Sequence, residues 1–211
     1  MQNIDYGADI RARKYSAGGV SKLLWYVETK ETVKLLQSHT TTEVKDLVMA
    51  NNLYSQRSED RLKREFSEIR KRIFNLPPDI REMIVSSDVG TSRLIVLIGA
   101  MTTDRMFFEL MYEEYRRKLH MGDELWKYSD VNIFFRNKKE QNEDVARWTD
   151  KAIAKLKQTY HKYMLEAGIL ENITDNVNEK KISKPYIEQE LRDKLLSNGM
   201  DKYLYALTGE K

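Results

Sequence analysis

The 211-residue sequence contains no cysteine, which excludes disulfide bridges, cysteine-ligated zinc and thiol nucleophiles. Only three prolines and nine glycines interrupt it, and so few helix breakers favour long helices over many turns. A long hydrophobic run is also missing. The most apolar stretch, residues 94–101, is much shorter than the roughly 20 residues of a membrane span, so we expect a buried core helix there. The N-terminal sequence has no apolar segment typical of a secretory signal.

A strong excess of charge of one sign is absent as well. The chain has 36 basic and 33 acidic residues, for a formal net charge of +3. This excess does not by itself indicate a nucleic-acid partner. Hydrophobic residues make up 41% and charged residues 33%, which is typical of a helix-rich globular protein. The composition therefore predicts a mainly α fold built as a multi-helix bundle.

Apolar periodicity and capping residues divide this fold into segments. Helices are predicted at residues 20–37, 43–51, 57–75, 79–87, 91–100, 104–119, 130–138, 145–167, 188–198 and 201–207. Two short strands, 169–173 and 181–187, flank the polar tip 174–180. We predict a helix-turn-helix-like N-terminal domain over residues 1–76. A helical C-terminal domain over residues 77–211 would carry a β-hairpin near residues 170–187.

The predicted helix 57–75 is amphipathic. Leu62, Phe66, Ile69 and Ile73 recur at helical spacing and form one apolar stripe. The opposite side carries basic residues: Arg57, Arg61, Arg64, Lys71 and Arg72. One interpretation is an ordinary solvated surface with local ion pairs. The other is the second helix of a helix-turn-helix, in which these cations contact phosphates and Ser55, Gln56 or Ser58 reaches a base or phosphate.

A second basic segment follows in the C-terminal half. The predicted helix 145–167 has Arg147, Lys151, Lys155 and Lys162 along one flank of its apolar face. The hairpin after it carries Lys180, Lys181 and Lys184. The order of short helix, longer helix and two strands is that of a winged helix, whose wing would present these lysines to a DNA backbone. A structural hairpin with solvated lysines is the alternative interpretation.

Patterns of catalytic residues are missing. His39, His120 and His161 are scattered without metal-ligand spacing, and we interpret them as surface or packing residues. Neither a phosphate-binding glycine loop nor a nucleophile elbow is present. An aromatic middle region is interpreted as core rather than as a base-stacking surface: Tyr112, Tyr115, Trp126, Tyr128, Phe134 and Phe135. The sequence therefore predicts no catalytic residue, no metal and no cofactor.

An ordered set of motifs points to a family. The motifs are "YSAGG" at 15–19, "ANNLYSQRSEDRLKREFSEIRKRI" at 50–73, "WTDKAIAKLKQTYHKYMLEAGIL" at 148–170 and "ISKPYIEQELRDKLLSNG" at 182–199. Together they resemble the BrxA family of bacteriophage exclusion (BREX) defence systems. The resemblance spans nearly the whole chain in the right order, although it is weak over residues 77–144.

The resemblance implies a cytoplasmic, non-enzymatic defence component whose helical fold is in part similar to that of NusB. It also implies binding to double-stranded DNA. Combined with the two basic helices, it leads to the hypothesis of a duplex-DNA-binding protein that contacts mainly backbone phosphates. Its expected partners are duplex DNA and other BREX proteins, with no membrane and no small-molecule substrate. Two alternatives stay open: a protein-interaction adaptor with an apolar patch near Phe107-Phe108 or Phe134-Phe135, and an RNA binder similar to NusB.

Overall fold

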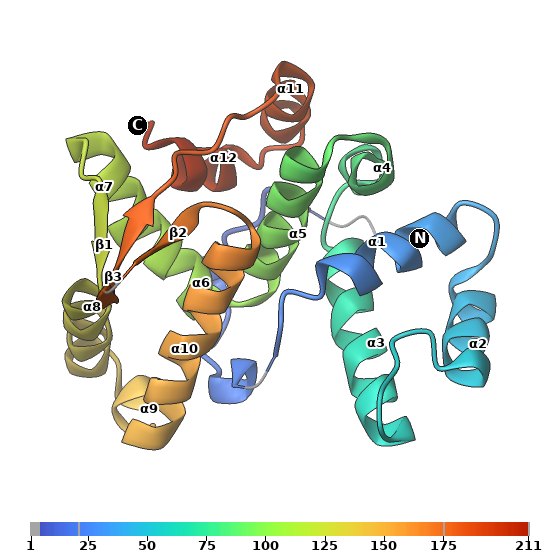
Figure 1. Cartoon of the computed structure of the whole chain (residues 1–211), viewed down its shortest axis with the longest axis horizontal. Coiled ribbons are helices and arrows are strands. Elements are labelled where there is room, and N and C mark those ends of the chain that lie inside the picture. The colour runs from blue at the N-terminus through green and yellow to red at the C-terminus, as the bar shows by residue number, and fades with distance from the viewer. Residues whose placement is uncertain (1–4, 21, 175, 211) are drawn as a thin grey trace.

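The computed structural model describes residues 5–20, 22–174 and 176–210, and the fold is mainly α, as predicted (Figure 1). The N-terminal helices are α1 (Tyr26–Leu36), α2 (Thr41–Asn51), α3 (Glu59–Phe74) and α4 (Pro78–Ser86). The central ones are α5 (Val89–Thr103), α6 (Arg105–Glu109), a π-helical segment (Leu110–Tyr115) and α7 (Arg116–Met121). The C-terminal ones are α8 (Tyr128–Gln141), α9 (Glu143–Ala146), α10 (Asp150–Glu166), α11 (Gln189–Ser197) and α12 (Asp201–Thr208). The strands are β1 (Leu125–Lys127), β2 (Leu170–Ile173) and β3 (Asn176–Ile182).

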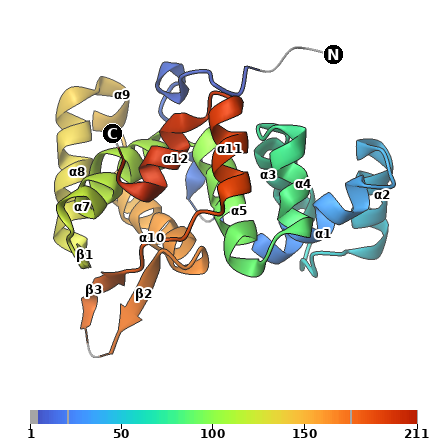
Figure 2. The same cartoon turned by 90° about the horizontal axis from the view of Figure 1, so that it is seen from above.

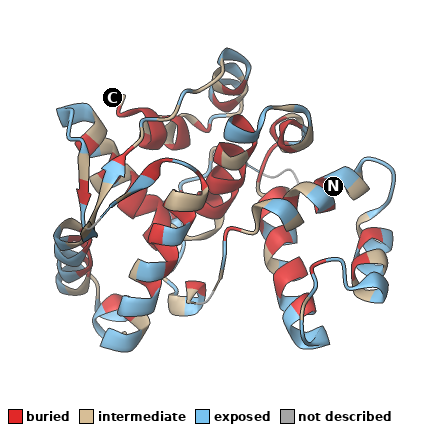
Figure 3. Cartoon of the chain, viewed as in Figure 1, coloured by how far each residue is buried: buried red, intermediate tan, exposed pale blue. Residues whose placement is uncertain are grey.

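Helix α5 forms the centre of the molecule. Its residues 94–101 are buried, as expected for a core helix, and most of its length is covered by other elements (Figure 3). It packs against α3, α4, α6 and α10, so the N-terminal and C-terminal helices share its surface. Asp104 ends α5 and caps α6, with its carboxylate accepting from the backbone N–H of Phe107 at 3.1 Å. In the described residues, every helix is too short or too polar to cross a bilayer.

Local capping fixes the N-terminal helix pair. The Thr40 hydroxyl and the Glu43 carboxylate form a reciprocal capping box at the start of α2. Asn52 ends α2 in the left-handed conformation with φ of 45°, which asparagine tolerates better than most residues. The Ser58 hydroxyl accepts from the backbone N–H of Arg61 and starts α3.

The predicted start of the first helix was wrong. Helix α1 begins at Tyr26 rather than at residue 20, after Trp25 in a left-handed conformation with φ of 56°. The backbone carbonyls of Leu23 and Leu24 accept hydrogen bonds from the buried Arg72 side chain. A side chain from a distant helix therefore takes the acceptors that a longer helix would have used.

The predicted hairpin is present, but its second strand was misplaced and a third strand was missed. Strands β1 and β2 both pair antiparallel with β3, in the order β1-β3-β2. The register sets Trp126 opposite Lys180 and Leu170 opposite Ile182. Strand β3 covers 176–182 rather than 181–187, since Pro185 has no backbone N–H to give to a neighbouring strand.

The predicted continuous helix 145–167 is interrupted. Helix α9 ends at Ala146, and α10 starts after Thr149, whose hydroxyl accepts from the backbone N–H of Ala152 at 3.2 Å. The predicted helix 130–138 extends over α8. The C-terminal stop of α10 is as predicted, because Gly168 follows with φ of 76°. The proposed domain division at residue 76 stays a prediction.

Candidate nucleic-acid interface

Helix α3 presents the predicted amphipathic surface. The apolar stripe is buried, and of the five basic residues predicted on the opposite side Arg57, Arg61, Arg64 and Lys71 are exposed. Arg57 lies in the turn before the helix rather than on it. Among the described residues, neither Arg61 nor Arg64 forms an ion pair, although the Arg64 guanidinium donates to the Asp60 backbone carbonyl at 3.1 Å. These cations are therefore free to contact an external anion.

Arg72 was wrongly assigned to the exposed basic side. Its side chain is 3% exposed and points into the junction between α3, α10 and the arm, which we define as residues 13–20 and 22–25. The guanidinium donates to the Leu23 carbonyl at 2.8 Å, to the Leu24 carbonyl at 3.1 Å and to the Tyr163 hydroxyl at 2.7 Å. It lies 5.3 Å from the Trp25 ring centroid and 5.2 Å from that of Tyr163. Arg72 is thus a structural clamp that a phosphate cannot reach.

The second basic helix is joined to the first through this clamp. Lys151, Lys155 and Lys162 are exposed on α10. The Arg72–Tyr163 bond connects the last turns of α3 and α10, and the N-terminal ends of both helices lie at the lower edge in Figure 1. Arg147 is exposed but lies in the break between α9 and α10, 3.7 Å from the Glu143 carboxylate. The α10 lysines and Arg147 therefore do not form one uninterrupted helical flank.

The hairpin lysines differ in exposure. Lys181 is exposed on β3, and Lys184 is exposed in the segment that follows. Lys180 is half-buried opposite Trp126, and its ammonium donates to the Val177 carbonyl at 3.4 Å. All three lie on or after β3 rather than at the loop tip. The view from above shows the hairpin projecting beyond the helices (Figure 2).

The polar residues before α3 have internal partners. The Gln56 amide donates to the Glu65 carboxylate at 2.7 Å, and the Gln56 backbone is bonded on both sides by the Asn52 side chain. The Ser58 hydroxyl caps α3. Ser55 is exposed, with φ of 52°. Gln56 and Ser58 therefore fix the turn geometry, whereas Ser55 remains open to a ligand.

A groove runs between α3 and the arm. Its arm side includes Val20, Lys22, Leu23 and Trp25, and its α3 side includes Arg61, Arg64, Glu65 and Glu68. Lys22 pairs with Glu68 at 2.8 Å. The arm residues were missed by sequence reasoning because a helix was expected from residue 20. The one available signal was the Gly18-Gly19 pair, where a side chain on Gly19 would crowd the Asp104 carboxylate at 3.0 Å.

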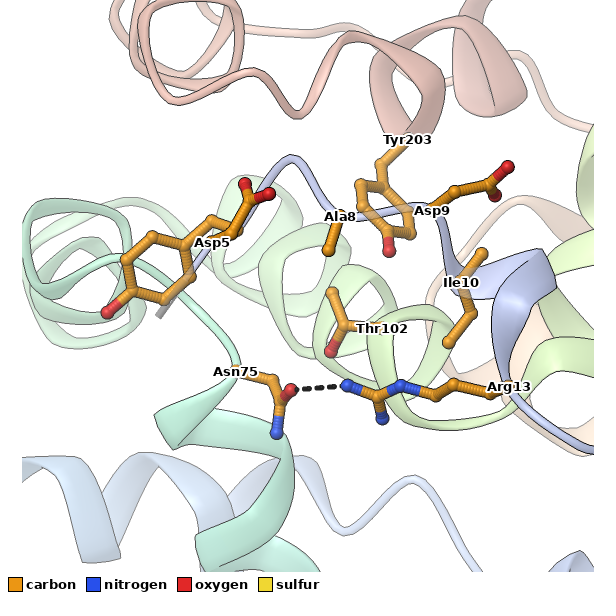
Figure 4. A pocket seen from close by; sticks show the side chains of 9 residues that line it. Asp5, Ala8, Asp9, Ile10, Arg13, Asn75, Thr102 and Tyr203 are labelled. Carbon is orange, nitrogen blue, oxygen red and sulfur yellow. Dashed lines mark hydrogen bonds between the residues drawn. The ribbon is translucent and has the colours of Figure 1, made fainter. Parts of the chain in front are cut away.

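The groove encloses about 760 Å³, within the range of ligand-binding pockets. A second hollow lies under the N-terminal segment, where Arg13 donates to Asn75 at 3.1 Å and Tyr203 and Thr102 form the lining (Figure 4). It encloses only about 40 Å³. The groove beside α3 is therefore the larger opening.

Glu65 is the unusual titratable group of the groove. It is 4% exposed, its Oε2 accepts from Gln56, and its Oε1 has no hydrogen-bond partner among the described residues. Burial, with a smaller contribution from the negative charge of Glu28, raises the pKa of Glu65 to about 7. A carboxyl that is partly protonated at neutral pH thus lines the groove beside two free arginines.

In the aromatic middle region, Tyr115, Trp126, Phe134 and Phe135 are buried core, as predicted, whereas Tyr112 and Tyr128 are half-buried. Phe107, Phe108, Phe134 and Phe135 are at most 2% exposed, so the apolar patch suggested there for an adaptor was wrong. His161 is a packing residue, as expected. Its Nε2 accepts from the Trp126 indole at 3.0 Å, and burial lowers its pKa.

Comparison with known proteins assigns the chain to a family. The family model described as BrxA matches residues 13–199. A BREX protein BrxA from Bacillus cereus (strain H3081.97) is 32% identical over 202 residues, which cover 95% of this chain and all of that protein. The crystal structure of an uncharacterized protein from Magnetospirillum magneticum superposes with a TM-score of 0.76 at 16% identity, covering 94% of this chain and all of that one, and shares the fold. The chain therefore belongs to the BrxA family.

Proposed function

We propose that this protein is a non-enzymatic, cytoplasmic component of a BREX phage-defence system that binds double-stranded DNA through backbone phosphates. The observation that supports the proposal is the connection of two basic helices by one buried clamp. Because Arg72 of α3 bonds Tyr163 of α10, the exposed cations of both helices keep fixed relative positions. A fixed array of cations suits the regular spacing of phosphates on a duplex.

The cations proposed to contact phosphate are those that the structure leaves exposed. They are Arg57, Arg61, Arg64, Lys71, Arg147, Lys151, Lys155, Lys162, Lys181 and Lys184, with the half-buried Lys180 at the margin. Arginine and lysine on phosphates carry little sequence information. The expected binding is therefore weakly specific and strongly salt-dependent.

A salt titration with a fluorescent duplex tests this proposal. Each phosphate contact contributes about 0.9 to the slope of log affinity against log salt. A variant with Arg61→Glu and Arg64→Glu should lose most of its affinity at low salt, and its slope should fall by roughly two. The matched control carries Lys34→Glu and Lys45→Glu, two exposed lysines on α1 and α2 with the same total charge change. The proposal is wrong if wild type does not bind at low salt, or if the two variants behave alike.

Other BREX proteins are the second class of proposed partner. Val177, near the start of β3, and Tyr186, after its end, are each 81% exposed and offer apolar contacts outside the basic helices. Co-purification with BREX components in high salt and nuclease would indicate a direct protein contact. Loss of that association in a Val177→Ser and Tyr186→Ser variant would place it at the hairpin.

A further inference from the structure

The groove between α3 and the arm combines two features that a duplex backbone does not use together, namely free cations and an apolar wall. Arg61 and Arg64 lie exposed on one side without an ion pair in the described residues. Trp25 and the 45% exposed Leu23 form an apolar wall on the other. Glu65 lies beneath the same groove, and its carboxylate oxygen without a partner in the described part of the chain is buried out of reach of a ligand. A ligand matching the two exposed sides has negative charge and a flat apolar surface.

Trp25 is held in place as a platform. The Arg72 guanidinium lies over its ring at 5.3 Å, while the side chain stays half-buried. The left-handed backbone at Trp25 is costly for a bulky residue and is maintained by the hydrogen bonds from Arg72 to the two preceding carbonyls. An aromatic ring fixed in this way loses little freedom when a second flat group stacks on it.

We propose that this groove binds one unpaired nucleotide of a DNA strand, with its phosphates on Arg61 and Arg64 and its base against Trp25. The inference rests on the proposed DNA binding and specifies it further. A base inside an intact duplex is covered on both faces by its neighbours and cannot reach a ring within a groove. Only a base outside the stack can do so, and stacking on an aromatic side chain tolerates any sequence. The charge of the groove rim favours phosphate over a cationic peptide.

The test compares three labelled DNA molecules by fluorescence anisotropy. The first is a plain duplex, the second is the same duplex with a six-nucleotide single-stranded extension, and the third carries an extension of equal length with abasic sites. Stacking of one base changes affinity by roughly 5- to 150-fold. Wild type should bind the second DNA at least about fivefold more tightly than the first and third. Equal affinity for all three, or for the two extended molecules, would overturn the inference.

Variants locate the effect and separate it from duplex binding. Trp25→Ala should remove the preference for the extension and leave plain-duplex affinity within about twofold, because the other cations stay in place. Leu23→Asp places a carboxylate on the exposed apolar wall and should also remove the preference. This variant keeps Trp25 and its ring contact with Arg72. A preference that persists in both folded variants, as judged by circular dichroism, would overturn the inference. If wild type binds the plain duplex but shows no preference for the extension, the further inference is wrong and the proposed function is not affected.

A competition experiment with an acidic peptide tests whether negative charge alone is enough to occupy the groove. If polyglutamate displaces the extended DNA as effectively as a single-stranded hexanucleotide does, charge alone fills the groove and the inference is wrong. Displacement by the hexanucleotide and not by its abasic counterpart supports a role for the base.

Discussion

Replacing Arg72 with methionine is expected to lower the free energy of unfolding by about 3–5 kcal/mol, the range typical when a buried charged partner is removed. The change would leave three acceptors without a donor: the carbonyls of Leu23 and Leu24 and the Tyr163 hydroxyl. Each unsatisfied buried group costs about 1–3 kcal/mol. Part of this cost is offset because the variant no longer buries a guanidinium. The contacts of that guanidinium with the Trp25 and Tyr163 rings are lost, which adds to the cost.

Urea unfolding followed by circular dichroism measures this change. The control is Lys71→Met, an exposed neighbour on the same helix, which should shift stability by less than about 0.5 kcal/mol. At a concentration and temperature where Arg72→Met is folded, the slope of its log duplex affinity against log salt should equal that of wild type, because no phosphate contact is removed. A slope that is lower by about one would refute the assignment of Arg72 as a clamp and restore it as a DNA contact.

Two further predictions concern stability. The pKa of Glu65 is about 7 in the folded protein and near 4.5 in the unfolded chain. The folded state therefore binds this proton more tightly, and the resulting stabilisation is fully present below about pH 4.5 and is lost as the pH rises to 7. The free energy of unfolding of Glu65→Gln should therefore rise relative to that of wild type between about pH 5 and 8. The rise should reach about 3 kcal/mol, at about 1.4 kcal/mol per pH unit of pKa shift. A difference between the two proteins that does not vary with pH would contradict this. Thr40→Ala should cost about 0.5–2 kcal/mol by removing the capping box with Glu43, with the exposed Thr42→Ala as control in the same urea assay. Equal effects of the two threonine changes would contradict the capping role.

Local signals in the sequence were sufficient for much of the fold. The apolar stripe of α3, the core nature of residues 94–101, the cap at Ser58 and the stop at Gly168 all follow from spacing or from one residue's conformational preference. The same signals failed where a distant partner decides. Helix α1 starts late because Arg72 occupies two carbonyls of the arm, and β1 was missed because its partner β3 lies far along the chain, with Leu125 opposite Lys181.

The candidate site shows the same division. Helical periodicity alone brought Arg61 and Arg64 to one side of α3, away from its buried stripe. Helical periodicity also assigned Arg72 to that side. The angular position of a residue around a helix does not reveal which distant segments pack against the last turn of that helix. Only the tertiary structure brought Trp25 and Leu23 opposite those arginines. Their approach depends on hydrogen bonds and stacking between segments about 50 and 90 residues apart in the chain, and no local pattern encodes such contacts.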